Sequence, residues 1–538
     1  MAFSSSVLKL LAGAAMVASA RAHLTMTKVG SFNNTDGTLL EIVVAGRDNY
    51  LFASSAAGIY VFMVGADLSP TKVGFYANMT DFGEPTSVAY NSVYDTVAFS
   101  VKSFDALTKG RVYVVPSFDK WMDCDFCVDN VQILETGYLP DMVTFTPDGR
   151  RILTANEGEP LDYTMPENDP VGSVSIFKRR WATGEFEPAC EVGFEYFNTA
   201  ERTERLVARG MRVGVKDFTT FAMDMEPEYI AVTENSNTAY VTLQENNAVV
   251  KIDIKGCEIK RMYPLGYKEW GNGVMMDASD EDGEINLQDW PTVNGMYQPD
   301  AIATFSGMSD GKRYFLIANE GDAREYGEED TDSFFADEIR VGDLAVEMGL
   351  NSTEAPYSDD ALGRLKVTTL PPFDGNIDEL YAYGGRQVDR PTKTNAKSIS
   401  IFDGKKGELV WDSGDFIEQF LADPANGFTD IFNSEGGMET FDGRSDDKGP
   451  EPEGLALAEI DGRMFVFVAL ERIGGWMCWD ISEPTAPVFQ SYVNSYEEDT
   501  APESGAIIPA DVSPSGHTLL MGAYEVSDTL AVFELKMH

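Results

Sequence analysis

The sequence predicts an all-β fold, a seven-bladed β-propeller, and three observations lead to this prediction. Short runs of β-branched and aromatic residues alternate along the chain with Gly, Asp and Asn, a pattern typical of strands joined by turns. Groups of these runs recur as a degenerate repeat. A full unit of the repeat contains four runs, and four strands make one propeller blade.

Most units open with a proline beside an acidic residue, followed by alternating apolar residues. A second and a third run follow each opening, as in RRILTANEG (150–158) and GSVSIF (172–177). A unit without the proline opening covers residues 39–77 and brings the number of units to seven. The openings are EPTSVAY (84–90), LPDMVTF (139–145), EPEYIAV (226–232), QPDAIAT (298–304), EPEGLAL (451–457) and, less clearly, APESGAI (501–507).

The last unit stops after its third run, at Leu535. The segment HLTMTKVGSF, which starts at His23, resembles the fourth run TKVGFYA of the first unit. We therefore expect the N-terminal strand to complete the last blade, because a closed ring has no exposed sheet edges. Two separate β-sandwiches are the alternative. A large insertion, residues 323–397, interrupts the fifth blade, and its segment 336–350 is a candidate helix.

The net charge and the N-terminal segment indicate which partners the protein binds and in which compartment it lies. The 538 residues carry 88 acids, 41 bases and a net charge of −47, which disfavours nucleic acids and anionic membranes and favours divalent cations. Residues 1–22 have the pattern of a signal peptide, with a free N-terminal helix as the alternative. We expect a single domain over residues 23–538, without a membrane span, secreted or at the cell-surface periphery. Three sequons could carry glycans: Asn33, Asn78 and Asn351.

The cysteines and histidines exclude several kinds of site. Three histidines are too few for a multi-histidine zinc or iron centre. Of five cysteines, Cys124 and Cys127 form a CDFC pair, for which a local bridge or buried thiols are favoured over a redox motif. An odd number of cysteines leaves at least one thiol free or paired between chains.

Acidic residues recur at two equivalent turns of the repeat, one before the first strand and one after the second. Both turns lie on the same face of a propeller, so these carboxylates should meet at one end of the channel and bind several Ca²⁺ ions. The alternative is a set of solvated acids beside turns. The candidate metal ligands are Asp141, Glu157, Glu159, Glu226, Glu228, Glu245, Asp300, Glu320, Asp322, Glu451, Glu453 and Glu471.

A second candidate calcium site is the loop DASDEDGEINL, residues 277–287. Asp280 and Asp282 match ligand positions of a calcium loop, and Asp277 lies beside the first position. The twelfth position is Asp289 instead of Glu, so a generic acidic turn is the alternative.

Four basic residues accompany the acidic motifs and could hold a phosphate against bound calcium. The alternative is that they form ion pairs with neighbouring acids. These candidates are Arg324, Arg444, Lys448 and Arg472.

Four long motifs resemble one family along nearly the whole chain: LPDMVTFTPDGRRILTANEGEP, EPEYIAVTENSNTAYVTLQENNAVVKIDI, MYQPDAIATF with LIANEGDAREY, and RSDDKGPEPEGLALAEIDGR with VALERIGG. The chain resembles the choice-of-anchor I family, which includes atypical alkaline phosphatases and mesenchyme-specific cell surface glycoproteins. The resemblance implies a β-propeller, and its phosphatase members imply calcium-dependent hydrolysis of phosphate monoesters outside the cell. APESGAI departs from the family's usual turn, which places Glu503 in doubt as a site residue.

Three functions are consistent with the sequence. The first is a secreted calcium-dependent alkaline phosphatase that acts on small phosphoesters, with metal-bound water, or a serine or threonine, as nucleophile. The second is a non-catalytic calcium-binding glycoprotein of the cell surface or matrix. The third is an interaction platform whose charge is only solvated surface.

Overall fold

The computed structural model describes residues 22–538, apart from residues 35–41, 45–46, 48, 78, 80, 125, 128–130, 215, 217, 272 and 384–398. The expected signal peptide, except Ala22, and the sequon at Asn78 lie outside the described residues.

The fold is all-β, and seven antiparallel sheets of four strands contain most of its strands. The first sheet contains β2 (Ile42–Val44), β3 (Tyr50–Ser55), β4 (Gly58–Val64) and β5 (Pro70–Tyr76). The second sheet contains β6 (Gly83–Asn91), β7 (Thr96–Ser103), β8 (Lys109–Val115) and β9 (Gln132–Tyr138). The third sheet contains β10 (Pro140–Phe145), β11 (Arg151–Asn156), β12 (Ser173–Arg179) and β13 (Phe186–Val192). The fourth sheet contains β14 (Pro227–Val232), β15 (Thr238–Leu243), β16 (Ala248–Asp253) and β17 (Glu258–Pro264). The fifth sheet contains β20 (Ile302–Ser306), β21 (Arg313–Ala318), β27 (Ile399–Asp403) and β28 (Leu409–Asp412). The sixth sheet contains β29 (Pro452–Ile460), β30 (Arg463–Leu470), β31 (Trp476–Asp480) and β32 (Val488–Val493). The seventh sheet contains β33 (Pro502–Ile508), β34 (Leu519–Tyr524), β35 (Thr529–Met537) and β1 (Leu24–Asn33).

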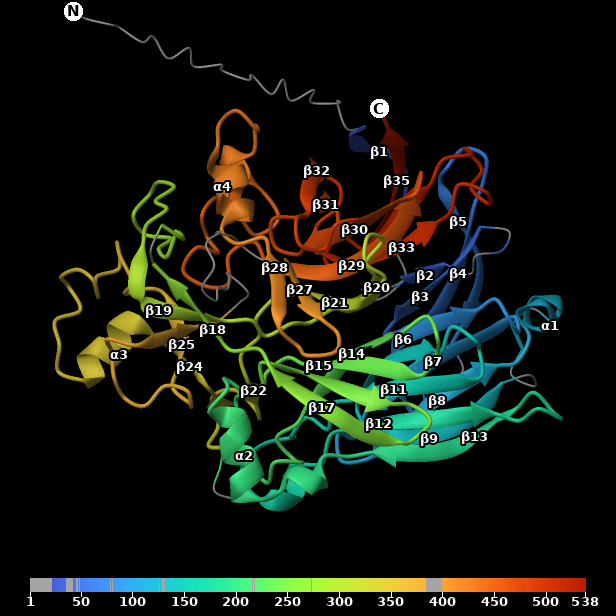
Figure 1. Cartoon of the computed structure of the whole chain (residues 1–538), viewed down its shortest axis with the longest axis horizontal. Helices are drawn as coiled ribbons and strands as arrows, with labels where there is room; N and C mark the ends of the chain where they lie inside the picture. The colour runs from blue at the N-terminus through green and yellow to red at the C-terminus, as the bar shows by residue number, and fades with distance from the viewer. Residues whose placement is uncertain are drawn as a thin grey trace, which may run out of the picture.

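The N-terminal strand β1 pairs with the C-terminal strand β35, from Leu24 opposite Met537 to Asn33 opposite Thr529. Figure 1 shows the two strands side by side, where the blue and red ends of the chain meet. The first strands of successive sheets contact one another in the order β2, β6, β10, β14, β20, β29 and β33, and β33 in turn contacts β2.

A proline and a bulge mark the first strand of most sheets. Four of these strands, β10, β14, β29 and β33, begin at the proline, and the pairing with the second strand shifts directly after it. Proline has no N–H to donate and is therefore placed at a strand start or a bulge. Since a bulge re-aims the side chains beside it, this device sets the direction of the acidic residue that follows the proline.

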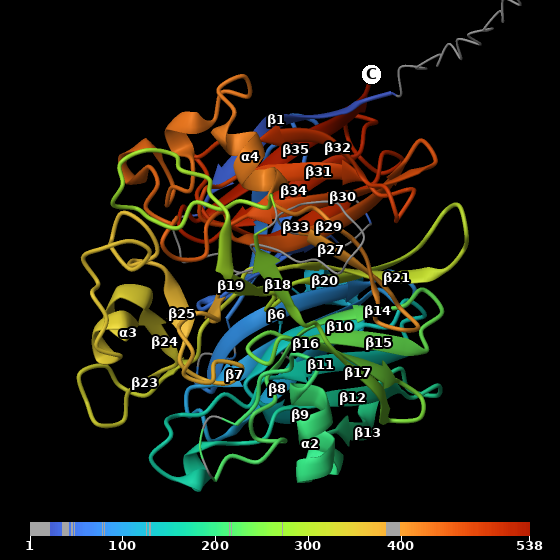
Figure 2. The ribbon, with the colours of Figure 1, turned by 60° about the vertical axis from the view of Figure 1, so that its left-hand side comes forward.

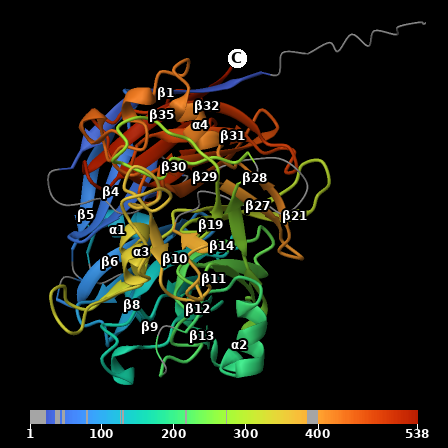
Figure 3. The same ribbon diagram turned by 90° about the vertical axis from the view of Figure 1, so that its left-hand side faces the viewer.

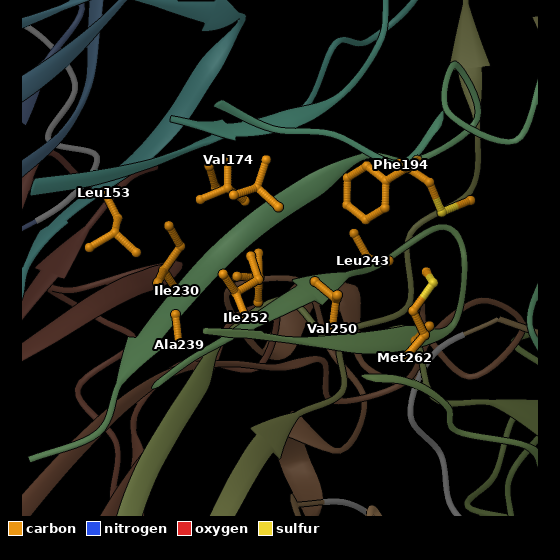
Figure 4. Packing of buried hydrophobic residues seen from close by; sticks show 14 of the residues in the cluster. Leu153, Val174, Phe194, Ile230, Ala239, Leu243, Val250, Ile252 and Met262 are labelled. Carbon is orange, nitrogen blue, oxygen red and sulfur yellow. The ribbon is translucent and has the colours of Figure 1, made fainter. Parts of the chain in front are cut away.

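Hydrophobic clusters fill the spaces between neighbouring sheets. In the cluster between the third and fourth sheets, Leu153 and Val174 lie opposite Ile230 and Ile252, all buried (Figure 4). The same two sheets are joined by the disulfide between Cys190 and Cys257, a pairing that the sequence leaves open.

The remaining cysteines follow the sequence pattern. Cys124 and Cys127, for which the sequence leaves a local bridge and buried thiols both open, form a local bridge directly after helix α1 (Phe118–Asp123). Cys478 on β31 is a buried free thiol.

The long segment between β21 and β27 packs beside the four-stranded sheets (Figures 2 and 3). Its strands β24, β25 and β26 form a five-stranded sheet with β18 and β19, two strands from the connection before β20. The repeat pattern of the sequence does not predict this sheet. The expected helix in this segment is α3. The elements are β18 (Tyr267–Trp270), β19 (Trp290–Met296), β22 (Glu325–Tyr326), β23 (Phe335–Ala336), β24 (Glu338–Arg340), α3 (Val341–Glu347), β25 (Lys366–Thr368) and β26 (Leu380–Ala382).

Helices are few. Besides α1 and α3 there are α2 (Ala200–Val207) and α4 (Phe416–Ala422). Among the described residues, no helix combines the length and apolar character needed to cross a membrane.

The pairing of β1 with β35 predicts a specific crosslink. Thr25 lies directly opposite Lys536, and opposed residues of an antiparallel pair have Cα atoms about 4.5–5.5 Å apart, within the range of a disulfide. The double variant Thr25→Cys with Lys536→Cys should therefore form a bond under mild oxidation, detected as a mobility shift that a reductant reverses. The control, Thr25→Cys with Met537→Cys, places the second thiol on the opposite face and should not react. Equal yields in the two variants would contradict the register.

Candidate functional site

In three of the sheets a backbone hydrogen bond joins the turn before the first strand to the turn after the second. The N–H of Glu157, after the second strand, donates to the carbonyl of Leu139, before the first strand, at 3.0 Å. The N–H of Glu471 donates to the carbonyl of Glu451 at 2.8 Å, and that of Glu525 to the carbonyl of Ala501 at 2.8 Å. The repeat thus brings both acidic turns of a sheet to the same end of the molecule.

The residue before the proline adopts the left-handed backbone conformation in four of these turns. The φ angles are 45° at Leu139, 43° at Gln298, 47° at Glu451 and 59° at Ala501. Because a side chain and a following proline both disfavour this region, the turn carries strain that the surrounding hydrogen bonds must hold.

The predicted metal ligands gather into two groups. The first acidic cluster comes from the third and fourth sheets and contains Asp141, Glu157, Glu159, Glu226, Glu228 and Glu245. The second acidic cluster comes from the fifth, sixth and seventh sheets and contains Asp300, Glu320, Glu451, Glu453, Glu471 and Glu503. Asp322 is exposed beside the second cluster and forms an ion pair with Lys448 at 2.5 Å.

Burial and mutual repulsion dominate the first acidic cluster. Burial raises the pKa of Asp141 to about 6, and burial together with the Glu245 carboxylate raises the pKa of Glu159 to about 7. Burial also raises the pKa of Glu226 to about 7, although Arg324 opposes the shift. Both carboxylate oxygens of Glu226 accept from the hydroxyl of Tyr326 at 2.9 Å.

The second acidic cluster contains the closest group of carboxylates. One oxygen from each of Glu320, Glu451 and Glu471 lies within 4.8 Å of the others. Burial and the neighbouring Glu503 and Glu471 carboxylates raise the pKa of Glu453 well above its usual range. Burial followed by the Glu451 and Glu320 carboxylates raises the pKa of Glu471 in the same way.

A cavity of 170 Å³ separates the first strands and reaches both clusters. Its lining includes Asp141, Asp300 and Glu503, together with Thr86 and Lys102. Thr86, Asp141, Asp300 and Glu503 each directly follow a proline in the repeat. Glu503 therefore lies with the other carboxylates of the repeat, although its turn diverges, and the proline–acid pattern is the signal that includes it.

Oxygen ligands without donors fit a hard cation. Buried oxygens of Glu228, Glu453 and Glu471 have no hydrogen-bond partner, nor does the side-chain oxygen of Gln298. A buried carboxylate without a partner is unfavourable, whereas Ca²⁺ takes roughly six to eight such oxygens. The oxygens of Glu320, Glu451 and Glu471 lie close enough to hold one Ca²⁺ ion, and Glu453 beside Glu471 and Glu320 adds a buried oxygen without a partner.

The four basic candidates all form ion pairs with carboxylates. Arg324 is buried and lies 3.5 Å from Asp224 and 3.7 Å from Glu226. Arg444 and Arg472 bind opposite oxygens of Glu451, at 2.7 Å and 3.2 Å.

Lys448 is 3.3 Å from Glu320 in addition to its pairing with Asp322. It also lines a mixed-charge pocket of 290 Å³ with Arg444 and Lys366. Six carboxylates face these three cations in the pocket: Glu159, Glu245, Asp322, Glu325, Glu338 and Asp447.

The predicted calcium loop belongs to neither acidic cluster. Asp277 is buried, and its carboxylate accepts from the N–H of Asn286 at 2.5 Å. Asp282 accepts from the Asn286 side chain at 2.7 Å. Asp280 forms a two-pronged ion pair with Arg364, with both distances 2.9 Å.

Two of the three predicted glycosylation sites are described, and both are exposed. Asn33 lies at the end of β1 and Asn351 follows α3.

The comparisons with known proteins define the family. The model of the choice-of-anchor I domain matches residues 41–484, so the chain belongs to the choice-of-anchor I family, as the sequence motifs predict. The chain is 27% identical over 334 residues to the mesenchyme-specific cell surface glycoprotein of Strongylocentrotus purpuratus, covering 56% of this chain and 41% of that protein. It is 37% identical over 123 residues to gigasin-3a of Magallana gigas, covering 22% of this chain and 38% of that protein.

The chain thus spans about two fifths of the length of these relatives. Among solved structures, the WD40 β-propeller domain of Doa1 aligns with 95% of this chain and 97% of its own at 9% identity, with a TM-score of 0.43. This likeness is too distant to define function.

The raised pKa values predict how stability depends on pH in a chelator. Folded-state pKa values of about 6 and 7 for Asp141 and Glu159 exceed the unfolded values of about 4. The folded protein then binds more protons than the unfolded chain, so stability is greatest below about pH 4 for these groups and falls as pH rises to about 7. We expect Tm measured in a chelator to decrease from about pH 5 to 8, and Glu159→Gln to flatten the decrease.

Glu185→Gln is the matched control for this measurement, because Glu185 is exposed and lies outside both clusters. A Tm that rises over the same pH interval, or an equal effect of the two substitutions, would contradict the assignment.

Proposed function

We propose that the protein is an extracellular calcium-binding glycoprotein of the cell surface or matrix, built on a closed seven-bladed β-propeller. The observation that carries the proposal is the set of buried carboxylate oxygens without donors in the second acidic cluster. Binding of a cation requires only these oxygen ligands and leaves the charged side chains in the arrangement that the structure shows.

Seven four-stranded sheets support the seven-bladed propeller, and the contact of β33 with β2 and the pairing of β1 with β35 support its closure. Closure packs the first strand of every sheet against both neighbouring sheets and leaves only short, protected edges.

Three features support a location outside the cell. The chain matches part of a cell surface glycoprotein. Two disulfides are typical of an oxidising compartment. A location outside the cell also agrees with the exposed sequons at Asn33 and Asn351 and with the expected signal peptide.

A calcium-dependent phosphatase is the second candidate, and the mixed-charge pocket favours it. Lys366, Arg444 and Lys448 could bind phosphate oxygens there, with the carboxylates of Glu159 and Glu245 close by. Bound calcium would supply positive charge for the phosphoryl group. Each of the three cations would first have to leave a carboxylate partner, which places this candidate second.

Substitution of one carboxylate tests the calcium centre. Glu453→Gln removes a charged ligand whose oxygen has no donor, so we expect Ca²⁺ affinity to fall about tenfold or more and the Ca²⁺-induced rise in Tm to shrink. In a chelator the same variant should be at least as stable as the wild type, because the substitution relieves buried repulsion. Titration calorimetry and thermal unfolding measure both effects.

Glu459→Gln is the matched control, because Glu459 is an exposed carboxylate on the same strand, β29. If Ca²⁺ neither binds nor raises the Tm of the wild type, the calcium-binding function is wrong. Hydrolysis of p-nitrophenyl phosphate by the calcium-loaded protein, lost in a chelator and in Lys448→Ala, would establish the phosphatase instead.

A further inference from the structure

Two loops that are far apart in the sequence meet outside the acidic clusters, where hydrogen bonds through Glu418 and Ser445 join them. We propose that a hard divalent cation, Ca²⁺, binds between Asp277 and Asp282 of one loop and Asp442 and Asn433 of the other. This site does not depend on the calcium centre of the second acidic cluster, since it shares no ligand with it.

Asp442 is the observation that points to a ligand. Its side chain is 2% exposed, and one carboxylate oxygen accepts from the hydroxyl of Ser445 at 2.6 Å. The other oxygen is buried and has no donor. A buried carboxylate oxygen without a donor or counter-charge is costly, and a cation would relieve that cost.

Asn433 adds a second buried oxygen. It is 0% exposed, and its side-chain oxygen has no donor. Its side-chain nitrogen donates to Glu418 at 3.2 Å and to the hydroxyl of Ser445 at 2.9 Å. The same Ser445 hydroxyl binds Asp442, so Asn433 and Asp442 are held beside each other.

Further contacts hold the aspartate loop against this pair. Glu418 accepts from the N–H of Asp277 at 3.2 Å as well as from Asn433. Arg364 joins Asp280 at 2.9 Å to Asp446 at 3.3 Å. Burial and the carboxylates of Asp277, Asp282 and Asp280 raise the pKa of Asp442 to about 8, in agreement with these contacts between the two loops.

In the loop that carries Asp277 and Asp282, the contacts distinguish the metal ligands from the residues that position them. Asp280 is neutralised by Arg364 and therefore serves to position the loop. Asn286 donates to both Asp277 and Asp282 and fixes their orientation, as residues behind metal ligands commonly do. All candidate ligand atoms are oxygens, a set that selects Ca²⁺ over softer transition metals.

An ion at this site would connect the segment before β19 to the segment before β29. The latter carries Arg444, Lys448 and Glu451, which belong to the mixed-charge pocket and the second acidic cluster. Binding here would stabilise the loop that supplies those residues.

The test uses the full chain with Tb³⁺ as a luminescent probe and Ca²⁺ as its competitor. Trp290 donates to the carbonyl of Met276, next to Asp277, at 3.3 Å, so it should sensitise Tb³⁺ at this site. We expect Asp442→Asn to remove most of the Trp290-dependent signal, to lower the bound Ca²⁺ by one equivalent in equilibrium dialysis, and to leave Tm in a chelator unchanged or higher. Trp290→Phe should remove the Trp290-dependent Tb³⁺ luminescence but leave the number of bound Ca²⁺ ions unchanged.

Glu281→Gln is the matched control, since Glu281 is exposed in the same loop. Asp282→Asn provides a second, partly exposed variant if Asp442→Asn does not fold. Full Ca²⁺ stoichiometry in both Asp442→Asn and Asp282→Asn, or an equal loss in Glu281→Gln, would overturn the proposal. In the Glu453→Gln background the Trp290-dependent signal should persist, which separates this site from the calcium centre.

Discussion

The strained proline turn before the first strand is the feature on which the rest of the site depends. Its carbonyl accepts a hydrogen bond from the residue after the second strand, and the bulge that follows the proline directs an acidic side chain towards the common end of the sheets. One turn repeated several times therefore creates an excess of buried negative charge. Such crowding is unfavourable unless cations lie among the carboxylates.

The chain supplies part of this compensation itself. Arg444 and Arg472 neutralise Glu451, and Lys448 neutralises Glu320 and Asp322. In the long segment between β21 and β27, Arg324 is buried against Asp224, and Asp337 is buried against Arg212. Arg472 also pairs with one oxygen of Glu471 at 3.0 Å, but the second oxygen of Glu471 and one oxygen each of Glu228 and Glu453 stay buried without a donor. The need for an external cation is thus confined to a few places, which is the physical basis of the proposed calcium centre.

The repeated features could be predicted from the sequence, because each depends on residues close together in the chain. The proline–acid openings locate the strand starts, and the acids at Glu157 and Glu471 mark the ends of second strands. The pairing of Arg212 with Asp337 could not be predicted, since the two residues are 125 positions apart and no periodicity relates them. The same applies to the disulfide between Cys190 and Cys257 and to the sheet that joins β18 and β19 to the long segment. Asp442 was missed because its motif lies far in sequence from the loop of Asp277.

The most direct test of the central claim is a crystal structure grown with Ca²⁺ and recorded at a wavelength where calcium scatters anomalously. We predict an anomalous peak among Glu320, Glu453 and Glu471, coordinated by oxygens at about 2.3–2.6 Å. A well-ordered second acidic cluster without a peak, with its carboxylates bonded only to water and to Arg444, Arg472 and Lys448, would contradict it.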